Sequence, residues 1–168
     1  DSARYFLFRS TPFGDEGDFS NQSLIERHNS ELADKLGNLV SRVSTLAEKY
    51  NLEETKTSLD STPLIKSVTS HLDSLAFDKA LNEIFAFIDQ ANTYIQDKKP
   101  WASKDPKVLY ELANAIKDSA ILLSPFIPQT SQKIAETFNF SLSLKDLEKP
   151  LKVSKIKKAQ VLFKKIQP

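Results

Sequence analysis

The sequence predicts an all-α protein, a helical bundle of about five to seven helices with a C-terminal strap. Two observations predict this fold. Only three glycines occur among the 168 residues. Apolar residues also recur at steps of three and four over long stretches, which is the spacing of a helix with one buried face. The prolines stand near the expected helix boundaries, where a missing backbone N–H is tolerated.

The first fifty residues predict three helical segments. Residues 3–9 are apolar and too short to be stable alone, so they form a helix or connector that packs on another part of the chain. A loop with proline and two glycines follows, and Ser20 stands where a side chain caps the next helix. We expect that helix over 21–29 and a second one over 31–50, which carries one apolar stripe.

The rest of the bundle follows from proline and capping signals. Residues 51–61 are polar and aperiodic, which indicates a loop, and the pair Thr62-Pro63 is a favourable helix start. We expect further helices over 64–75, 77–96, 105–123 and 128–138. Several phenylalanines fall in these segments, so we expect much of the core to be aromatic.

The C-terminal tail is basic. Residues 145–168 hold eight lysines against two acidic residues, so the remainder of the chain is acidic. We expect a short helix over 144–149. Beyond it we expect a strap on the bundle surface whose apolar residues alternate among the lysines, namely Val153, Ile156, Val161, Phe163 and Ile166. Such a tail fits nucleic acid, although lysine runs are more often simply solvated surface.

Several functions are excluded or disfavoured by what the chain lacks. It has no cysteine, which excludes disulfides, thiolate zinc sites and cysteine nucleophiles. It has two histidines far apart and no phosphate loop, serine elbow or zinc-protease motif, so we expect no catalytic residue and no metal site. No stretch is long and apolar enough to cross a membrane, and no signal peptide is evident, so we expect no membrane partner and a cytoplasmic location.

A few polar and aromatic residues fit recognition of unpaired bases, which proteins stack on aromatic rings and hydrogen-bond along exposed edges. Trp101 follows Lys98-Lys99-Pro100 in a break between helices; in such a loop, tryptophan is more often a plug into the core than a stacking platform. Asn38 and Arg42 lie one turn apart at the polar edge of their helix. Asp89 either orients an arginine or is a solvated acid.

Five segments together resemble the C-terminal helical domain of class I methionyl-tRNA synthetases. They are Asp1–Arg9, Thr11–Ser20, Asn29–Arg42, Ala91–Trp101 and Leu162–Ile166. The resemblance covers nearly the whole chain in order, and the pieces Asn-Leu-Val-Ser-Arg and Lys-Pro-Trp are specific when they occur together. Residues 51–75 resemble nothing in that family that we can match, and their role is open.

The resemblance implies a role for each candidate residue. Trp101 stacks on the first base of a CAU anticodon, Asn38 and Arg42 hydrogen-bond the exposed base edges, and Pro100 shapes the loop beside them. Asp89 tunes anticodon discrimination, while Lys98 and Lys99 contact the RNA backbone.

The resemblance also implies a domain plan. Residues 1–19 connect to a catalytic domain that is missing here, residues 20–143 form the anticodon-binding bundle, and residues 144–168 form the basic strap. The family's HIGH and KMSKS motifs and its zinc-binding cysteines are absent, so this chain alone is not expected to be an enzyme and needs no cofactor. The parent methionine–tRNA ligase would use ATP and possibly zinc in its catalytic domain.

The expected partners are the anticodon stem-loop of methionine tRNA and, in the intact chain, the protein's own catalytic domain. The fragment itself is expected to be monomeric. Two alternatives remain: the helical anticodon domain of a valine, isoleucine, leucine or cysteine enzyme, and a helical protein-interaction module with Trp101 buried as a plug.

Overall fold

The computed structural model describes residues 1–17, 19–147 and 149–167. It consists of α1 (Ser2–Ser10), α2 (Asn21–Arg27), η1 (His28–Gly37), α3 (Asn38–Tyr50), α4 (Thr62–Asp73), α5 (Phe77–Lys98), α6 (Pro100–Ser103), α7 (Pro106–Leu123), α8 (Pro128–Phe138) and η2 (Leu144–Asp146). No strand occurs in the described ranges. The all-α bundle is therefore confirmed, with seven helices when α2, η1 and α3 are taken as one.

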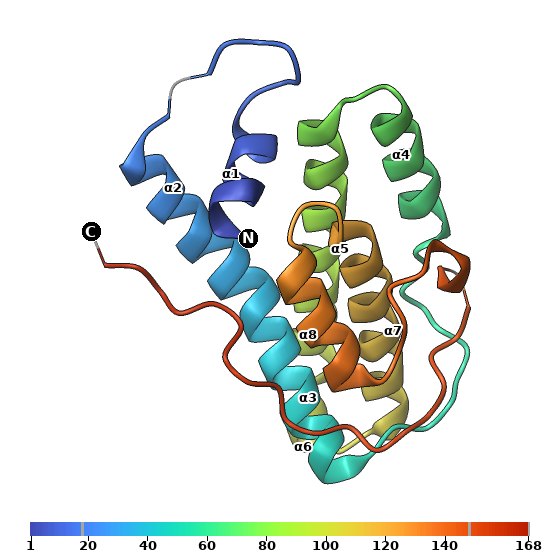
Figure 1. Cartoon of the computed structure of the whole chain (residues 1–168). Coiled ribbons are helices and arrows are strands. Elements are labelled where there is room, and N and C mark those ends of the chain that lie inside the picture. Colours follow the sequence, from blue (N-terminus) through green and yellow to red (C-terminus); the bar gives the residue numbers. More distant parts are fainter. Residues whose placement is uncertain (18, 148, 168) are drawn as a thin grey trace.

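One long helix replaces the two that we expected over 21–29 and 31–50. Segments α2, η1 and α3 run on without interruption (Figure 1), because the residues at both junctions, His28 and Gly37, keep right-handed helical dihedrals. The expected break was wrong. Ser30 does not cap a new helix, since its hydroxyl donates back to the carbonyl of Glu26 at 2.7 Å. The middle segment η1 is a π-helix, a rare form with wider hydrogen-bond spacing.

Helix α7 is the centre of the bundle. Every residue from Val108 to Leu123 is buried, and α3, α5 and α8 pack around it. Its start agrees with the capping signals, because the Asp105 carboxylate accepts from the Lys107 N–H at 2.9 Å and Pro106 follows as the first helical residue. The expected helices at 64–75, 77–96, 105–123 and 128–138 are confirmed, with boundaries shifted by one or two residues.

Helix α1 is part of the core. Tyr5 is fully buried, and its ring lies 5.3 Å from that of Phe85 on α5. Nearby, Phe8 makes edge contacts with Phe77 and Phe126 at 5.1 and 5.4 Å between ring centroids. These edge-to-face pairs stabilise the core beyond simple burial. The expectation that much of the core is aromatic is wrong in part, because most of the buried apolar residues are Leu, Ile, Val and Ala.

A half-buried carboxylate, that of Glu31, connects α1 to the long helix. Glu31 accepts from the Tyr5 hydroxyl at 2.6 Å and from Arg9 at 3.1 Å, and Arg27 approaches it at 3.5 Å. Burial first, and then the Glu31 charge, raise the pKa of Tyr5 far above its usual range. The phenol therefore remains a hydrogen-bond donor at all physiological pH values.

Residues 51–61 form the expected loop, and α4 then packs along α5. Side chains of α7 hold this loop through hydrogen bonds. The Glu111 carboxylate accepts from the backbone N–H and hydroxyl of Ser58, both at 2.5 Å, and from the Tyr94 hydroxyl at 2.9 Å. The Ser61 hydroxyl donates to Asp118 at 2.6 Å. Residues 51–75 therefore cover one side of α5 and α7.

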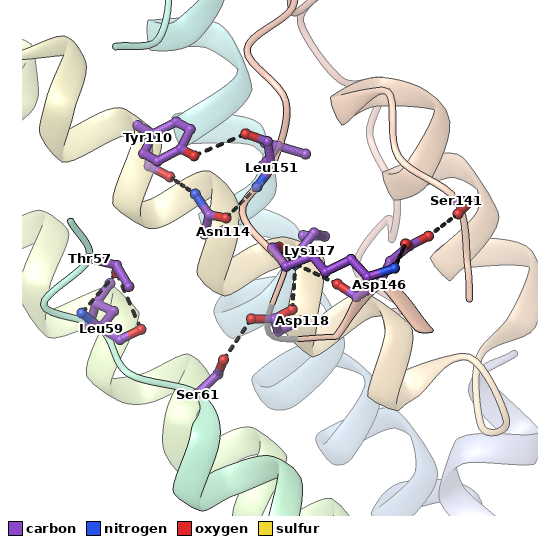
Figure 2. A network of polar contacts seen from close by, with 11 residues as sticks. Thr57, Leu59, Ser61, Tyr110, Asn114, Lys117, Asp118, Ser141, Asp146 and Leu151 are labelled. Atoms are coloured by element: carbon purple, nitrogen blue, oxygen red, sulfur yellow. Dashed lines mark hydrogen bonds and ion pairs between the residues drawn. The ribbon is translucent and has the colours of Figure 1, made fainter. Parts of the chain in front are cut away.

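The strap begins on the other polar residues of α7 (Figure 2). The Asn114 amide oxygen accepts from the Leu151 N–H at 2.8 Å, and the Tyr110 hydroxyl donates to the Leu151 carbonyl at 3.0 Å. Lys117 is buried, pairs with Asp118 at 2.9 Å and donates to the Asp146 carbonyl at 2.9 Å. These hydrogen bonds offset the free-energy cost of burying the polar groups of α7 and of the strap backbone away from water.

The strap then follows the long helix back toward its start (Figure 1). The Ala159 N–H donates to the Ser44 hydroxyl at 3.0 Å, and farther on the Asn29 amide exchanges two hydrogen bonds of 2.9 Å with the backbone of Ile166. His28 uses both ring nitrogens, meeting the Ser2 hydroxyl and the Lys164 carbonyl at 2.8 Å each.

The expected strap on the bundle surface is confirmed, and residues 151–160 have no regular structure. Of the apolar residues named from the sequence, Ile156 is buried, whereas Val153 and Val161 are 45% and 71% exposed. Leu151 and Ala159 are buried as well, because irregularly spaced side chains of the helices hold the strap backbone there. The short helix expected over 144–149 is a single turn, Leu144–Asp146, and position 148 lies outside the described residues.

Replacing Asn114 tests the anchorage of the strap. In Asn114→Ala the buried Leu151 N–H loses its acceptor, so we expect the free energy of unfolding to fall by about 1–3 kcal/mol. Urea denaturation followed by circular dichroism measures it. Asn82→Ala, at an exposed position on α5, is the matched control and is expected to change stability by less than about 0.5 kcal/mol. Equal effects of the two variants would contradict this account.

Candidate functional site

A sharp turn at the end of α5 presents Trp101 to solvent. Lys99 adopts left-handed dihedrals (φ 46°, ψ 56°), which end the helix, and Pro100 begins the single turn α6. Lys104 then adopts a second left-handed conformation that ends α6. Pro100 is buried and fixes this turn, while the Trp101 side chain is 41% exposed. Trp101 is therefore not a core plug.

Arg42 of α3 covers one face of that ring. Its guanidinium carbon lies 5.2 Å from the centroid of the Trp101 ring, a cation–π contact. Gln96, one turn before the end of α5, holds the same guanidinium. With its amide oxygen toward Arg42, it accepts two hydrogen bonds of 2.9 and 3.1 Å. The opposite orientation would point donors at donors, so the oxygen faces the arginine.

Asn38 lies one turn before Arg42 on the same side of α3. Its side chain is exposed and that of Arg42 is half-buried, as expected for the polar edge of this helix. The structure thus brings Asn38, Arg42, Pro100 and Trp101 together from two distant parts of the sequence. Their roles toward RNA stay predictions.

Asp89 does not orient an arginine, which was one of the two roles considered from the sequence; it pairs with a lysine instead. Its carboxylate pairs with the Lys35 ammonium at 2.7 Å, and both groups are partly exposed. Beside this pair, the Asn92 amide donates to the Lys35 carbonyl at 3.3 Å and to the Ile88 carbonyl at 3.0 Å. Lys35, Asn92 and Asp89 therefore join the π-helical segment to α5.

The spacing of Asp89, Asn92 and Gln96 in the sequence places all three on one flank of α5. Nothing in the sequence indicated that Asn92 and Gln96 contact the long helix, as they do at Lys35 and Arg42. Lys98 and Lys99 are exposed, as a backbone contact requires. The Lys98 ammonium also lies 5.5 Å from the Tyr94 ring centroid.

The described part of the chain contains no group of three or more histidine or acidic side chains placed to hold a metal ion. No described helix is long and apolar enough to cross a membrane.

A family model described as the anticodon-binding domain of tRNA ligases matches residues 62–166. The chain belongs to this family. A second model, described as class I tRNA synthetases (M), matches residues 1–44 of this anticodon-binding domain, including Asn38 and Arg42. The first match begins at Thr62, so part of segment 51–75, for which we recognised no resemblance, lies within the family's own pattern.

Curated relatives carry the name methionine–tRNA ligase. One from Caldanaerobacter subterraneus is 38% identical over 99% of this chain and 30% of its own length. One from Helicobacter pylori is 35% identical over 91% of this chain and 26% of its own length. This anticodon-binding domain therefore spans about a third or less of the relatives it matches.

Solved structures agree with this assignment. The apo form of Mycobacterium tuberculosis methionyl-tRNA synthetase superimposes with a TM-score of 0.90 at 25% identity, covering 99% of this chain and 39% of that one. The same enzyme bound to methionyl-adenylate gives 0.88, also at 25% identity, over 97% of this chain and 37% of that one. The helical anticodon-binding fold is thereby confirmed.

The contact between Arg42 and Trp101 can be tested without RNA. Trp101 is the single tryptophan, so fluorescence reports on it alone. Removing the guanidinium in Arg42→Ala uncovers one ring face, and we expect the acrylamide quenching constant to rise. Lys49→Ala, on the same helix, is the control and is expected to leave the constant unchanged. A constant that does not respond to Arg42→Ala would mean that the two side chains do not stack in solution.

Proposed function

We propose that this chain reads the CAU anticodon of methionine tRNA as part of a methionine–tRNA ligase. The observation that carries the proposal is the half-exposed Trp101 ring, turned out of the bundle by Lys99 and Pro100 and bordered by Arg42. The relatives' shared name supports methionine as the amino acid. We infer that the alternative reading as a helical interaction module fits less well, because it required a buried tryptophan.

Stacking supplies affinity in this mechanism. A base stacked on an aromatic ring contributes roughly 1–3 kcal/mol, whereas an exposed cation–π contact contributes about 0.5–1 kcal/mol. A base therefore displaces the Arg42 guanidinium from the Trp101 ring. The first anticodon base, a cytosine, takes that place, and Arg42 becomes available for hydrogen bonds.

Edge contacts supply identity. The Asn38 amide both donates and accepts, and the Arg42 guanidinium donates as a planar fork, so together they match the exposed edges of unpaired bases. The hydrogen bonds to Gln96 restrict the positions that the Arg42 guanidinium can adopt. The Asp89–Lys35 pair lies beside this surface and tunes discrimination through its charges, while Lys98 and Lys99 attract the phosphates.

The intact ligase would activate methionine with ATP and transfer it to tRNA in the cytoplasm, using its separate catalytic domain. Exposed apolar side chains on α1 and the loop after it suit contact with that domain. Leu7 and Phe13, each 64% exposed, line one hollow, and Phe19 farther along the loop is 59% exposed. Residues 1–19 would then act as the connector, residues 20–143 as the reader and residues 144–168 as the strap.

Replacing the ring tests the stacking role. We expect Trp101→Ala to weaken binding of a CAU anticodon stem-loop by about tenfold or more, the equivalent of at least 1.4 kcal/mol. Fluorescence anisotropy of a labelled stem-loop measures the Kd. Trp101→Phe should keep part of the affinity, and Leu144→Ala, at another exposed apolar position, should keep all of it. An unchanged Kd for Trp101→Ala would reject stacking.

Anticodon selectivity tests the edge contacts. We expect Asn38→Ala and Arg42→Ala to reduce the ratio of affinities between CAU and other anticodon stem-loops by roughly five- to a hundredfold, taking about 1–3 kcal/mol per lost contact. Asn82→Ala should retain the ratio of the unmodified protein. If both site variants stay equally selective, Asn38 and Arg42 do not read the bases. A preference for a valine, isoleucine, leucine or cysteine anticodon would instead favour the other class I ligases.

A further inference from the structure

A basic groove lies between α8 and the C-terminal strap. Its volume is about 500 Å³, and it is lined by Lys133, Glu136, Thr137, Asn139, Lys155, Lys157, Lys158, Gln160 and Leu162. Four of these residues are lysines and one is acidic. None of the four lysines is within ion-pair distance of an acidic side chain in the described ranges. The groove therefore carries uncompensated positive charge.

The backbone that carries these lysines is fixed. The Asn139 amide donates to the Ser154 hydroxyl at 3.1 Å and to the Lys155 carbonyl at 3.2 Å. Glu48 of α3 accepts from the Lys158 N–H at 3.1 Å. Ile156 is buried between the lysines. The side chains that hold the strap are thus distinct from the lysine ammonium groups, which remain in solvent.

The groove and the Trp101 site lie on opposite flanks of α3. At 100° per residue, Ser44 and Glu48, which hold the strap, lie roughly 200–240° from Arg42 around the helix axis. The exposed side of α3 lies between them, with Asn38 and Thr45 on its surface. A helix with its side chains is about 10–12 Å wide. A folded RNA laid across that exposed side therefore meets both flanks.

We propose that this lysine groove binds the phosphodiester backbone of the RNA whose bases are read at Trp101. The proposal rests on the proposed function for its ligand. Lysine ammonium groups are point charges that suit phosphates and carry no base information. An acidic protein segment fits less well, because Leu162 is the one apolar residue lining the groove and anchors for apolar side chains are lacking. The groove fixes the position of the RNA, and the Trp101 site reads it.

The test compares salt dependence. Each phosphate contact contributes about 0.7–0.9 to the slope of log K against log salt concentration. In Lys155→Gln/Lys157→Gln/Lys158→Gln we expect the slope for a CAU stem-loop to fall by about two to three, with the selectivity between anticodons unchanged. Lys133→Gln, which lies on α8 and not on the strap, should lower it by about one. The matched control Lys56→Gln/Lys66→Gln/Lys79→Gln removes the same charge at exposed positions elsewhere and should lower it by less than one.

Equal slopes for the groove and control triples would overturn the proposal. So would a groove triple that binds RNA normally but loses affinity for poly-glutamate, which would assign the groove to an acidic protein segment. Trp101→Ala, measured in parallel, separates the two hypotheses. Its failure to alter CAU binding would count against the proposed function, whereas an unchanged salt slope in the groove triple counts against the groove alone.

Discussion

The burial of α7 from Val108 to its end at Leu123 is the constraint on which the rest of the structure depends. A helix surrounded on all sides usually carries apolar residues alone, yet this one holds Glu111, Asn114, Lys117 and Asp118. Buried polar groups without partners are costly, so each must be satisfied. The partners come from two irregular segments, the loop at 51–61 and the beginning of the strap (Figure 2). Residues without regular structure are thus positioned by the most regular element of the bundle.

The anchoring of the strap on α7 also fixes its course over the surface of the bundle. Once Leu151 is fixed on α7, the following residues are led to Ser44 and Glu48 of α3 and then to Asn29. Helix α3 consequently has three different neighbours: the core, the strap, and the turn that carries Trp101. Helix α3 therefore borders the proposed base-reading site on one flank and, on the other, the strap that carries the groove lysines.

Much of the fold could be predicted from the sequence because its signals are local. Asp105-Pro106 marks a helix start through capping and proline geometry. Pro63 marks another, but Thr62, expected as its cap, is itself the first residue of α4, and the residue before it makes no side-chain capping bond. The uninterrupted long helix could not be predicted, because Asn29 and Ser30 are residue types typical of helix ends. Here their side chains bond instead to the strap at Ile166 and to the Glu26 carbonyl. The course of the strap depends on hydrogen bonds to distant side chains such as Asn114 and Ser44, which leave no pattern in its own residues.

The candidate site shows the same division. A lone tryptophan after Lys-Lys-Pro and an Asn/Arg pair one turn apart were recognisable, but their proximity was not, because they lie far apart in the chain. The hydrogen bonds between Gln96 and Arg42 and the ion pair between Asp89 and Lys35 could not be recognised from the sequence either, since both join residues of different helices.

The π-helical segment makes the orientation of Asn38 and Arg42 depend on the number of residues in it. Asn38 is the first residue after η1, and Arg42 follows one turn later. In an α-helix one residue corresponds to about 100° of rotation. Loss of a single residue between His28 and Gly37 would let the segment close into an α-helix, but it would turn either Asn38 and Arg42 or Tyr5's partner Glu31 away from its contacts. Related chains should therefore tolerate substitutions in this segment far more readily than insertions or deletions.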